Sequence, residues 1–347
     1  MRVLVAPDKF AGTLTAPQAA DSIGRGWSEV RPDDVVDLAA MADGGPGFLE
    51  VLRAALGGHV VLLDTTGPLG QPVVARLLVV RDDLATTAYV EAAQVCGLPL
   101  APQPCRPLEA STSGLVAVLQ AAADAVGRAG PDVEVRRVVV GVGGTSSTDG
   151  GRPVAEALAT GWPPGVELVA AVDVGIPLLG PSGAARTFGP QKGATPADVE
   201  RLEERLDDWA ATTGADPSVP GVGAGGGLGF GLVLLGARLQ GGAEVVAEAV
   251  RLRERVGAAD LVLTGEGRLD ETTWAGKVVA EVAGAARDQQ TTCWALVGER
   301  TVDDDAAGHG VSRVWSLSDE VGPGPARGEA AGSLTTMAAR AAASWPG

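Results

Sequence analysis

Residues 138–151, VVVGVGGTSSTDGG, decide how the rest of the chain is interpreted. Residues 138–140 form a short β-branched run, which is typical of a strand that is covered on both faces. The glycines that follow permit positive φ angles and a close approach of a ligand to the backbone. This stretch therefore predicts a buried strand, then a loop rich in glycine and hydroxyl groups, and then a helix.

The loop in this stretch carries groups that would surround a polyanion. Four successive hydroxyls precede one carboxylate; they are Thr145, Ser146, Ser147, Thr148 and Asp149. Backbone N–H groups and hydroxyls suit a phosphate, and a carboxylate suits Mg²⁺. Asp is also a common helix cap, and glycine-rich turns occur in many α/β proteins. A phosphate site and a purely structural turn are both open at this point.

The composition is that of a globular protein with many tight turns. The chain has 347 residues, of which 46% are hydrophobic, 20% are charged and 50 are glycines. This length predicts two domains, or one domain with a large insertion. The formal charge is −16, from 43 acidic and 27 basic residues. Because no basic stripe interrupts this acidic balance, the sequence argues against nucleic acid and anionic membranes as partners.

Cysteines and histidines are too few to carry the chemistry. The three cysteines are widely spaced and form no CxxC pair. They argue against a disulfide framework and a zinc site, and they fit a cytoplasmic location. The two histidines leave no material for a Ser-His-Asp relay. The opening MRVLVAPDKF is expected to be a first strand and not a signal peptide, so the chemistry must rest on Asp, Glu, Lys, Arg and the backbone.

Strand and helix patterns alternate along most of the chain. Residues 3–6 and 35–40 are expected strands, and residues 15–30 and 46–56 are the helices that follow them. Three extended segments, residues 60–63, 73–80 and 87–92, indicate a second lobe with partly antiparallel strands. Further strands are expected over residues 138–140, 166–172, 261–264, 292–297 and 312–317, and further helices over residues 111–126, 196–211, 232–239 and a final Ala-rich stretch that ends near residue 344.

The segment with the highest glycine content is residues 220–231, PGVGAGGGLGFG. A helix that packs very closely against a neighbour and a loop that binds a ligand both fit it equally well. The phosphate-binding pattern GxxxxGK[ST] is absent from the chain. The common nucleotide-binding folds are therefore not indicated.

Five loops at the ends of expected strands each place a carboxylate beside small residues. They contain Asp8, Asp43, Asp149, Asp173, and Glu266 with Asp270. The carboxyl ends of parallel strands meet at one edge of a sheet, so these loops favour a shared acidic cleft. Candidate basic partners are Lys9, Arg186, Lys192, Arg268 and Lys277; ordinary solvated surface is an equal alternative for Arg186 and a weaker one for Lys192. Such a cleft would supply the groups that phosphoryl transfer needs.

The chain resembles the glycerate kinase family, in its bacterial type II, glycerate 2-kinase-like group. The resemblance lies in six ordered blocks, APDKFAGTLTA, MADGGPGF, GVGGTSSTDGG, GPQKGA, GAGGGLGFGL and TGEGRLDETTWAGK. It implies an α/β fold of two lobes, in which both termini form a parallel-sheet lobe and a second α/β lobe is inserted. We expect residues 1–65 and 285–347 in the terminal lobe and residues 66–284 in the inserted lobe. The resemblance also implies phosphorylation of D-glycerate, or of a closely related small hydroxy acid, with ATP and Mg²⁺.

The matching blocks imply a set of site residues. Lys9, Asp173, Arg268 and Asp270 are the candidate catalytic residues, with Asp173 or Asp270 facing the attacking hydroxyl. The candidate cofactor-binding residues are Asp43, Gly44, Gly45, Gly143, Gly144, Thr145, Ser146, Asp149, Lys192, Glu266 and Lys277, and Asp8 lies in the first of the blocks. Asp43 and Asp149 are the candidate metal ligands.

Several positions inside these blocks depart from the family pattern. Ala11 stands where the family usually has Lys, Pro46 for Glu, Phe48 for Thr, Thr148 for Asn, Gly175-Ile176 for Thr-Asn, and Thr272 for Gln. Each departure removes a charge, an amide or hydrogen-bonding capacity, and polar contacts discriminate strongly between substrates. Two alternatives follow, a relative that binds a nucleotide or metabolite with weak or no catalysis, and a kinase for a different small alcohol.

Overall fold

The chain forms two compact α/β units. The structure, a computed structural model, describes residues 1–101, 105–128, 130, 133–274, 276–301, 306–322 and 328–346. The terminal unit comprises Met1–Asp43, Glu50–Ala55 and Ala243–Gly347, and the inserted unit comprises Gly44–Leu49 and Leu56–Gly242. The predicted α/β class with parallel sheets is confirmed.

The boundaries of the units differ from the expected ones at both ends of the insertion. Residues 261–284 were expected in the inserted lobe, but the strand β9 (Leu261–Gly265) pairs with strands of the terminal unit on both of its edges. The strand β3 (His59–Thr66) pairs with β4 (Pro72–Arg81) along its whole length. The compact units therefore hold residues 56–65 in the inserted unit and residues 243–284 in the terminal unit.

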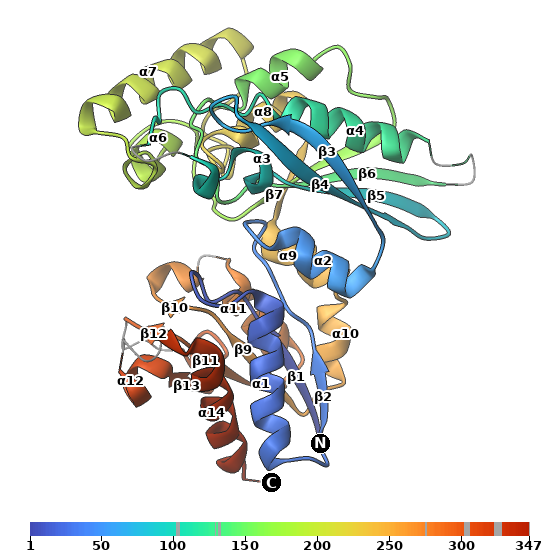
Figure 1. Ribbon diagram of the computed structural model, residues 1–347, viewed down its shortest axis with the longest axis vertical. Helices are drawn as coiled ribbons and strands as arrows, with labels where there is room; N and C mark the ends of the chain where they lie inside the picture. The colour runs from blue at the N-terminus through green and yellow to red at the C-terminus, as the bar shows by residue number, and fades with distance from the viewer. Residues whose placement is uncertain are drawn as a thin grey trace. The chain divides into compact units, whose positions relative to one another are not determined.

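The terminal unit is built on a five-stranded parallel sheet (Figure 1). Its order is β13 (Arg313–Ser316), β11 (Thr292–Val297), β9, β1 (Arg2–Pro7) and β2 (Val35–Leu38). Val3 is in register with Leu261 on one side and with Val36 on the other. The central strands β1 and β9 are buried on both faces, as their continuous apolar runs predict.

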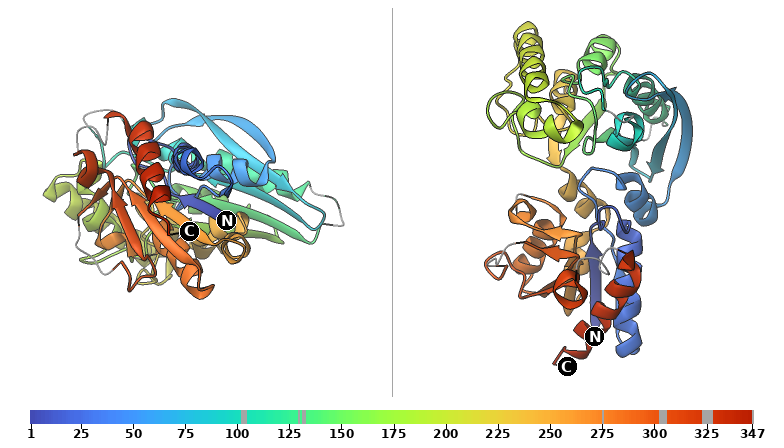
Figure 2. Two further views of the ribbon diagram at one scale, coloured as in Figure 1. Left: turned by 90° about the horizontal axis from the view of Figure 1, so that it is seen from below. Right: turned by 60° about the vertical axis from the view of Figure 1, so that its left-hand side comes forward.

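Helices cover both faces of this sheet. On one face α1 (Ala16–Val30) and α14 (Ala330–Ala343) lie side by side (Figure 2), and a Cβ at Gly26 would lie 2.0 Å from the Thr335 carbonyl oxygen. Helix α1 begins where expected, with Thr15 and Gln18 in a capping box. On the other face lies α11 (Val278–Asp288), which packs against α10 (Leu252–Gly257). The smaller elements are α9 (Gly242–Ala249), β10 (Arg268–Leu269), η3 (Glu271–Trp274), β12 (Glu299–Arg300) and α12 (Leu317–Val321), and α2 (Phe48–Leu56) crosses the boundary between the units.

The inserted unit contains a six-stranded mixed sheet. Its order is β3, β4, β5 (Ala85–Glu91), β6 (Val135–Gly141), β7 (Val166–Val172) and β8 (Arg238–Gly241). β3, β4 and β5 are antiparallel neighbours, and the strands from β5 to β8 are parallel, so the predicted partly antiparallel lobe is confirmed. The helical elements are α3 (Ala93–Cys96), η1 (Leu98–Leu100), α4 (Leu115–Gly127), α5 (Arg152–Leu158), α6 (Ala184–Phe188), η2 (Pro190–Lys192), α7 (Pro196–Thr213) and α8 (Leu228–Leu234).

Two expected helices have different bounds. The helix expected from residue 111 begins at Leu115, and Gly114 is its N-cap residue. Thr112 does not cap this helix, because its backbone N–H and its hydroxyl donate to Asp149. The helix expected over residues 232–239 is α8, which ends at Leu234. Gly236 then adopts a φ of +88°, and the chain continues as β8 alongside β7. The second difference turns a predicted helix end into a strand.

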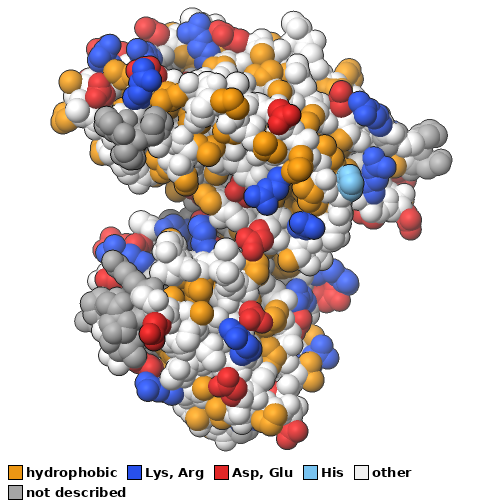
Figure 3. All heavy atoms as spheres, viewed as in Figure 1, with side chains coloured by type: hydrophobic (Ala, Val, Ile, Leu, Met, Phe, Trp, Pro, Cys, Tyr) orange, Lys and Arg blue, Asp and Glu red, His pale blue; other side chains and the backbone are white. Residues whose placement is uncertain are grey.

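The surface carries charges of both signs. Figure 3 shows acidic and basic side chains interspersed with apolar ones on the face that it draws. Among the described residues, no helix combines the length and the apolar character that crossing a membrane requires.

Candidate active site

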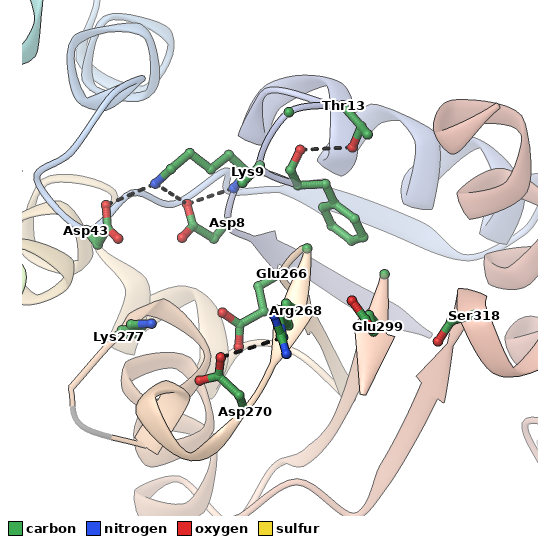
Figure 4. Close-up of a pocket in the computed structure, with 15 residues that line it drawn as sticks. Asp8, Lys9, Thr13, Asp43, Glu266, Arg268, Asp270, Lys277, Glu299 and Ser318 are labelled. Carbon is green, nitrogen blue, oxygen red and sulfur yellow. Dashed lines mark hydrogen bonds and ion pairs between the residues drawn. The ribbon is translucent and has the colours of Figure 1, made fainter. Parts of the chain in front are cut away.

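The terminal unit contains a cavity of about 650 Å³ at the carboxyl ends of its strands. The loops after β1, β2, β9 and β11 contribute most of its lining, which is the edge of a parallel sheet where ligands commonly bind. The lining residues are Asp8, Lys9, Phe10, Ala11, Gly12, Thr13, Asp43, Glu266, Gly267, Arg268, Asp270, Lys277, Gly298, Glu299 and Ser318. In Figure 4, Asp8, Lys9 and Asp43 lie across the cavity from Glu266, Arg268 and Asp270.

Lys9 joins two carboxylates on one wall of this cavity. Its Nζ lies 3.1 Å from Asp43 Oδ1 and 3.6 Å from Asp8 Oδ1. Burial acts to lower the pKa of Lys9, but the charges of Asp43 and Asp8 outweigh burial and raise that pKa. Lys9 is therefore held as a cation, as a group that contacts phosphate or a substrate carboxylate must be.

Asp8 is the more buried of these two carboxylates. Its backbone N–H donates to the Gly265 carbonyl at the end of β9, and its Oδ1 accepts from the Lys9 backbone N–H at 2.7 Å. Burial, followed by the negative charge of Asp43, raises the pKa of Asp8 to about 7, while Lys9 acts in the opposite direction. Asp8 therefore changes charge near neutral pH.

Glu266, on the opposite wall, is a second carboxylate of this kind. Its side chain is 9% exposed, and Oε1 accepts a 2.7 Å hydrogen bond from the hydroxyl of Thr273, which is fully buried. Burial raises the pKa of Glu266 to about 7, although the Thr273 hydrogen bond lowers it. Both Glu266 and Asp8 thus combine burial with a perturbed pKa, which is common at functional sites.

Asp270 lies in a different environment at the rim. Its Oδ1 accepts from the Thr272 backbone N–H at 2.9 Å and from the Thr272 hydroxyl at 2.6 Å. The Thr272 hydroxyl in turn accepts from Lys277 Nζ at 2.6 Å, and Arg268 Nε lies 3.9 Å from Asp270 Oδ2. The Thr272 hydrogen bond holds the pKa of Asp270 below its ordinary value, against the effect of burial. Asp270 therefore stays ionised across the neutral range.

Two glycines allow the loops around Glu266 to approach one another. A Cβ at Gly265 would lie 2.0 Å from the Leu296 carbonyl oxygen, and one at Gly298 would lie 2.5 Å from the Gly267 carbonyl oxygen. Behind them, β10 and β12 pair in parallel, with Arg268 opposite Glu299. The glycines therefore fix the position of the backbone that carries Glu266 and Arg268.

In the inserted unit, the loop of residues 142–151 follows β6 and meets the end of β7. The Gly143 backbone N–H donates to the Gly44 carbonyl at 3.2 Å. A Cβ at Gly143 would lie 2.9 Å from Gly45 Cα and 3.0 Å from Asp173 Oδ2. The DGG block, the glycine loop and Asp173 therefore meet at one place, as the strand-end argument predicts.

Lys192 lies beneath this loop. Its side chain is 4% exposed, and Nζ donates to the Ser147 carbonyl at 2.6 Å and contacts the Thr145 hydroxyl at 3.4 Å. Burial lowers the pKa of Lys192 to about 8, although the carboxylates of Asp149 and Asp173 act to raise it. Lys192 therefore supports the backbone of this loop from beneath.

Asp149 is occupied by neighbouring donors. Its Oδ2 accepts from the Thr112 backbone N–H at 2.7 Å and from the Thr112 hydroxyl at 2.9 Å, and its Oδ1 accepts from the Gly151 N–H at 3.2 Å. Burial raises its pKa, against these hydrogen bonds. Asp149 is not the N-cap residue of α5, because Gly151 occupies that position. It ties the loop to residue 112.

The glycine-dense segment packs tightly against the same loop. A Cβ at Gly226 would lie 2.0 Å from the Ser147 carbonyl oxygen and 2.8 Å from Lys192 Nζ. A Cβ at Gly231 would lie 2.5 Å from the Gly151 carbonyl oxygen. Of the two interpretations left open by the sequence, close packing of a helix against a neighbour is therefore the one that the contacts favour.

The sequence-predicted residues form two groups. Asp8, Lys9, Asp43, Glu266, Arg268, Asp270 and Lys277 line the terminal-unit cavity. Gly44, Gly45, Gly143, Gly144, Thr145, Ser146, Asp149, Asp173 and Lys192 lie within the inserted unit. Arg186 belongs to neither group, because it pairs with Glu200 at 2.6 Å on the surface of α7, which supports the solvated-surface interpretation.

Sequence reasoning missed the roles of Thr112 and Thr273. Thr112 was expected to lie at the start of the helix over residues 111–126, and Thr273 was not singled out although it lies in the last motif block. A hydroxyl seven positions after a glutamate is a weak signal in the sequence. The two side chains meet only because the turn of η3 brings them together.

The departures from the family pattern fall in both units. Thr272 links Lys277 to Asp270, and Ala11 lines the cavity. Phe48 is buried, with its ring 6.3 Å from that of Tyr89 in an edge-to-face arrangement. The buried Thr148 hydroxyl has no hydrogen-bond partner in the described part of the chain. Ala11 and Thr272 therefore lie at or beside the terminal-unit cavity, whereas Phe48 and Thr148 are buried in the inserted unit.

Comparison with known proteins places this chain among phosphotransferases. Residues 3–163 and 162–346 match the family model described as the glycerate kinase family. A Mycobacterium tuberculosis protein of uncharacterized function is 42% identical over 99% of this chain and 91% of its own length. Glycerate 2-kinase of Escherichia coli is 32% identical over 93% of this chain and 92% of its own. The crystal structure of a candidate glycerate kinase 2 from Salmonella typhimurium LT2 superposes with a TM-score of 0.79 at 31% identity, over 99% of this chain and 97% of that one.

Proposed function

Because the chain belongs to the glycerate kinase family and is therefore a kinase, we propose that it transfers the terminal phosphoryl group of ATP to a hydroxyl of D-glycerate or of a closely related small hydroxy acid. The family and the class of reaction are established by the match over almost the whole chain. The nucleotide, the acceptor and the roles of individual residues are the content of the proposal.

The observation that supports the proposal most is the mixture of charges in the terminal-unit cavity. Three cations, Lys9, Arg268 and Lys277, lie among the carboxylates of Asp8, Asp43, Glu266 and Asp270. Phosphoryl transfer involves little covalent chemistry by the protein and needs cations that offset charge and a carboxylate near the attacking oxygen. We assign Lys9 and Arg268 to a phosphate or to the substrate carboxylate.

Within the inserted unit, we propose a phosphate-binding backbone. Gly143 and Gly144 follow the buried strand β6, and close packing leaves no room for side chains at Gly143. Thr145 and Ser146 add hydroxyls, while Lys192 holds the loop from beneath. We assign these residues to the nucleotide, and Asp173 to the neighbourhood of the reacting groups.

Mg²⁺ is proposed to enter with the nucleotide phosphates. Mg²⁺ is usually held by one or two carboxylates together with phosphate oxygens and waters. Among the described residues, no group of three or more His, Cys, Asp or Glu side chains is arranged to hold a metal by itself. Asp149 fits poorly as a ligand, because the donors of Thr112 and Gly151 already contact its two oxygens. Asp43 fits better, since it lines the cavity. When bound, the ion would offset negative charge on the phosphates.

An ADP-release assay on the full chain tests the proposal. The acceptors are D-glycerate, L-glycerate, glycolate, lactate and glycerol, each with MgATP, and ³¹P NMR identifies the phosphorylated carbon. We expect turnover with D-glycerate above that with the other acceptors. Background rates with all five acceptors would contradict the proposal. Calorimetric binding of ATP without turnover would then favour the silent relative.

Arg25 provides a matched control for the cavity lysine. Arg25 pairs with Asp21 on the exposed surface of α1, with 60% of its side chain exposed, so R25Q removes a positive charge outside the cavity. We expect K9Q to lower kcat/KM by at least about 100-fold, because it removes the cation that pairs with two carboxylates and that we assign to a phosphate or to the substrate carboxylate. R25Q is expected to keep the wild-type value.

A further inference from the structure

The terminal-unit cavity holds two carboxylates whose environments differ in a way that separates their roles. Asp270 accepts two hydrogen bonds from Thr272 and lies 3.9 Å from Arg268, so its charge is well compensated. Glu266 is nearly buried and accepts a hydrogen bond from Thr273 alone within the described part of the chain. A pair of carboxylates placed in such contrasting surroundings is the usual sign of different acid–base roles.

Thr273 fixes which oxygen of Glu266 is free to take a proton. Its hydroxyl accepts a 3.1 Å hydrogen bond from the Asp270 backbone N–H, which leaves the hydroxyl proton to point at Glu266 Oε1 at 2.7 Å. Because Oε1 already accepts this hydrogen bond, Oε2 is the oxygen with more capacity to accept a further proton. Glu266 itself lines the cavity.

We propose that Glu266 accepts the proton of the attacking hydroxyl and that Thr273 is the residue that positions it. This inference rests on the proposed kinase function and refines it, because Asp173 and Asp270 were the expected carboxylates for this step. The surroundings agree with the geometry, since burial raises the pKa of Glu266 to about 7, near the value that suits a general base at neutral pH.

The proposed step is an in-line transfer of the phosphoryl group from ATP to the acceptor oxygen. The acceptor oxygen forms a bond to the γ-phosphorus of ATP, the bond from that phosphorus to the β,γ-bridging oxygen breaks, and ADP leaves with that electron pair. The hydroxyl proton moves to Glu266 Oε2 and later passes to solvent. Glu266 returns to its ionised form for the next cycle.

The charged groups around Glu266 set the direction of its response. Lys277, at the start of α11, lowers its pKa, whereas Asp8, after β1, and Asp270, before η3, raise it. Arg268 lines the cavity from β10, and Lys9 and Asp43 line the wall on the Asp8 side. Asp8 is the competing candidate, because it is also buried, and the experiment must separate the two.

The pH dependence of kcat/KM separates them. The wild type should lose activity below about pH 7, tenfold for each pH unit, because the base must be ionised. E266Q should lower kcat/KM by about 100-fold or more and should abolish this limb. D8N should retain the limb but move it to lower pH, because it removes a negative charge that raises the Glu266 pKa. A limb that survives E266Q and disappears in D8N would overturn the proposal.

Three threonine variants test the positioning role. T273V removes the donor that favours the ionised carboxylate, so the limb should move to higher pH by roughly half to one unit. T273S keeps both hydrogen bonds and should restore the wild-type limb. T264V is the matched control, because Thr264 is also fully buried and donates only to the Ala6 carbonyl. A purely structural role for Thr273 predicts lower rates in T273V without a displaced limb, and that result would overturn the proposal.

A direct titration distinguishes failure of this inference from failure of the proposed function. The ¹³C carboxyl resonance of Glu266, assigned by its loss in E266Q, should titrate near pH 7 in the wild type and higher in T273V. If no acceptor is phosphorylated, the proposed kinase activity fails, while this titration still supports the positioning of Glu266 by Thr273. Titration of Glu266 at or below about pH 5 would overturn the inference whether or not the chain is active.

Discussion

Lys192 Nζ donates a 2.6 Å hydrogen bond to the Ser147 carbonyl oxygen, so a buried ammonium supports the backbone of the loop that follows β6. The lysine and the loop come from segments 45 residues apart. The contacts of the ammonium at hydrogen-bonding distance are a carbonyl and a hydroxyl, and neither carries a negative charge. These contacts therefore offset only part of the cost of burying the positive charge.

The first prediction concerns alkaline stability. The pKa of Lys192 is about 8 in the folded protein and 10.5 ordinarily, so the unfolded chain binds more protons between these two values. The free energy of unfolding contributed by this group should therefore rise between about pH 8 and pH 10.5, in total by roughly 3 kcal/mol. Urea unfolding of the wild type and of K192M across this range measures it. Parallel pH curves for the two proteins would contradict the prediction.

The second prediction applies the same reasoning to Glu266 with the opposite sign. Its pKa is raised to about 7 by burial, so the folded protein binds more protons than the unfolded chain between pH 4.5 and 7. The stability contributed by this group is present at acidic pH and is lost as the pH rises through 7. At pH 8, the free energy of unfolding of E266Q should exceed that of the wild type by at least about 1 kcal/mol. The difference should disappear near pH 4.5, and a stabilisation that persists there would point to packing instead.

The third prediction concerns the glycine-dense segment. Gly226 and Gly214 have the same φ of +70°, but a Cβ at Gly226 would lie 2.0 Å from the Ser147 carbonyl oxygen, whereas nothing lies within 4 Å of one at Gly214. G214A should cost about 1–2 kcal/mol from backbone strain alone. G226A should cost at least about 2 kcal/mol more, because the loop must move. Equal unfolding midpoints in urea would mean that the close packing against Ser147 is unimportant.

The sequence predicted the fold well where local patterns decide it. Strands β1, β7 and β11 and helix α1 lie close to the expected ranges, because apolar runs and the capping box of Thr15 are local signals. The short strands β8, β10 and β12 were not expected. β8 is a strand because it pairs with β7, and β10 and β12 are strands because they pair with each other. A pattern of two to four residues is too short to predict such pairing.

The candidate site was predicted as a set of residues but not as a set of contacts. Strand-end loops with carboxylates brought Asp8, Asp43 and Glu266 into one cavity, which is the expected outcome for a parallel sheet. The occupation of Asp149 by Thr112 could not be foreseen, because the two are 37 residues apart and Asp149 was expected to hold a metal or to cap the following helix. Long-range hydrogen bonds of this kind decide which carboxylate is available.

The fourth prediction follows from that occupation. D149N should lower the free energy of unfolding by about 1–3 kcal/mol, because it disturbs buried hydrogen bonds from Thr112. Its apparent affinity for Mg²⁺, measured from the magnesium dependence of ADP release at fixed ATP, should stay within about threefold of the wild type. D43N should weaken that affinity about tenfold or more. The reverse order of the two variants would restore Asp149 as the metal ligand.

The last prediction concerns Thr272, which stands where the glycerate kinase family usually has glutamine. Its hydroxyl accepts from Lys277 Nζ and donates to Asp270 Oδ1, so it links a cation to an anion at the rim of the cavity. T272V breaks both contacts and leaves Lys277 without this tether. Because Thr272 is exposed, the free energy of unfolding should change by less than about 1 kcal/mol.

The effect of T272V should appear in substrate binding. We expect KM for the substrate that meets Lys277 to rise about three- to tenfold, because a mobile lysine loses more side-chain entropy on binding, while KM for the other substrate changes little. Separate titrations of ATP and of the acceptor identify which one it is. T13V is the matched control, since Thr13 lines the same cavity and its hydroxyl contacts the Phe10 carbonyl. If T13V raised the same KM as much as T272V, the change would reflect a general loss of polarity in the cavity and not the link from Lys277 to Asp270.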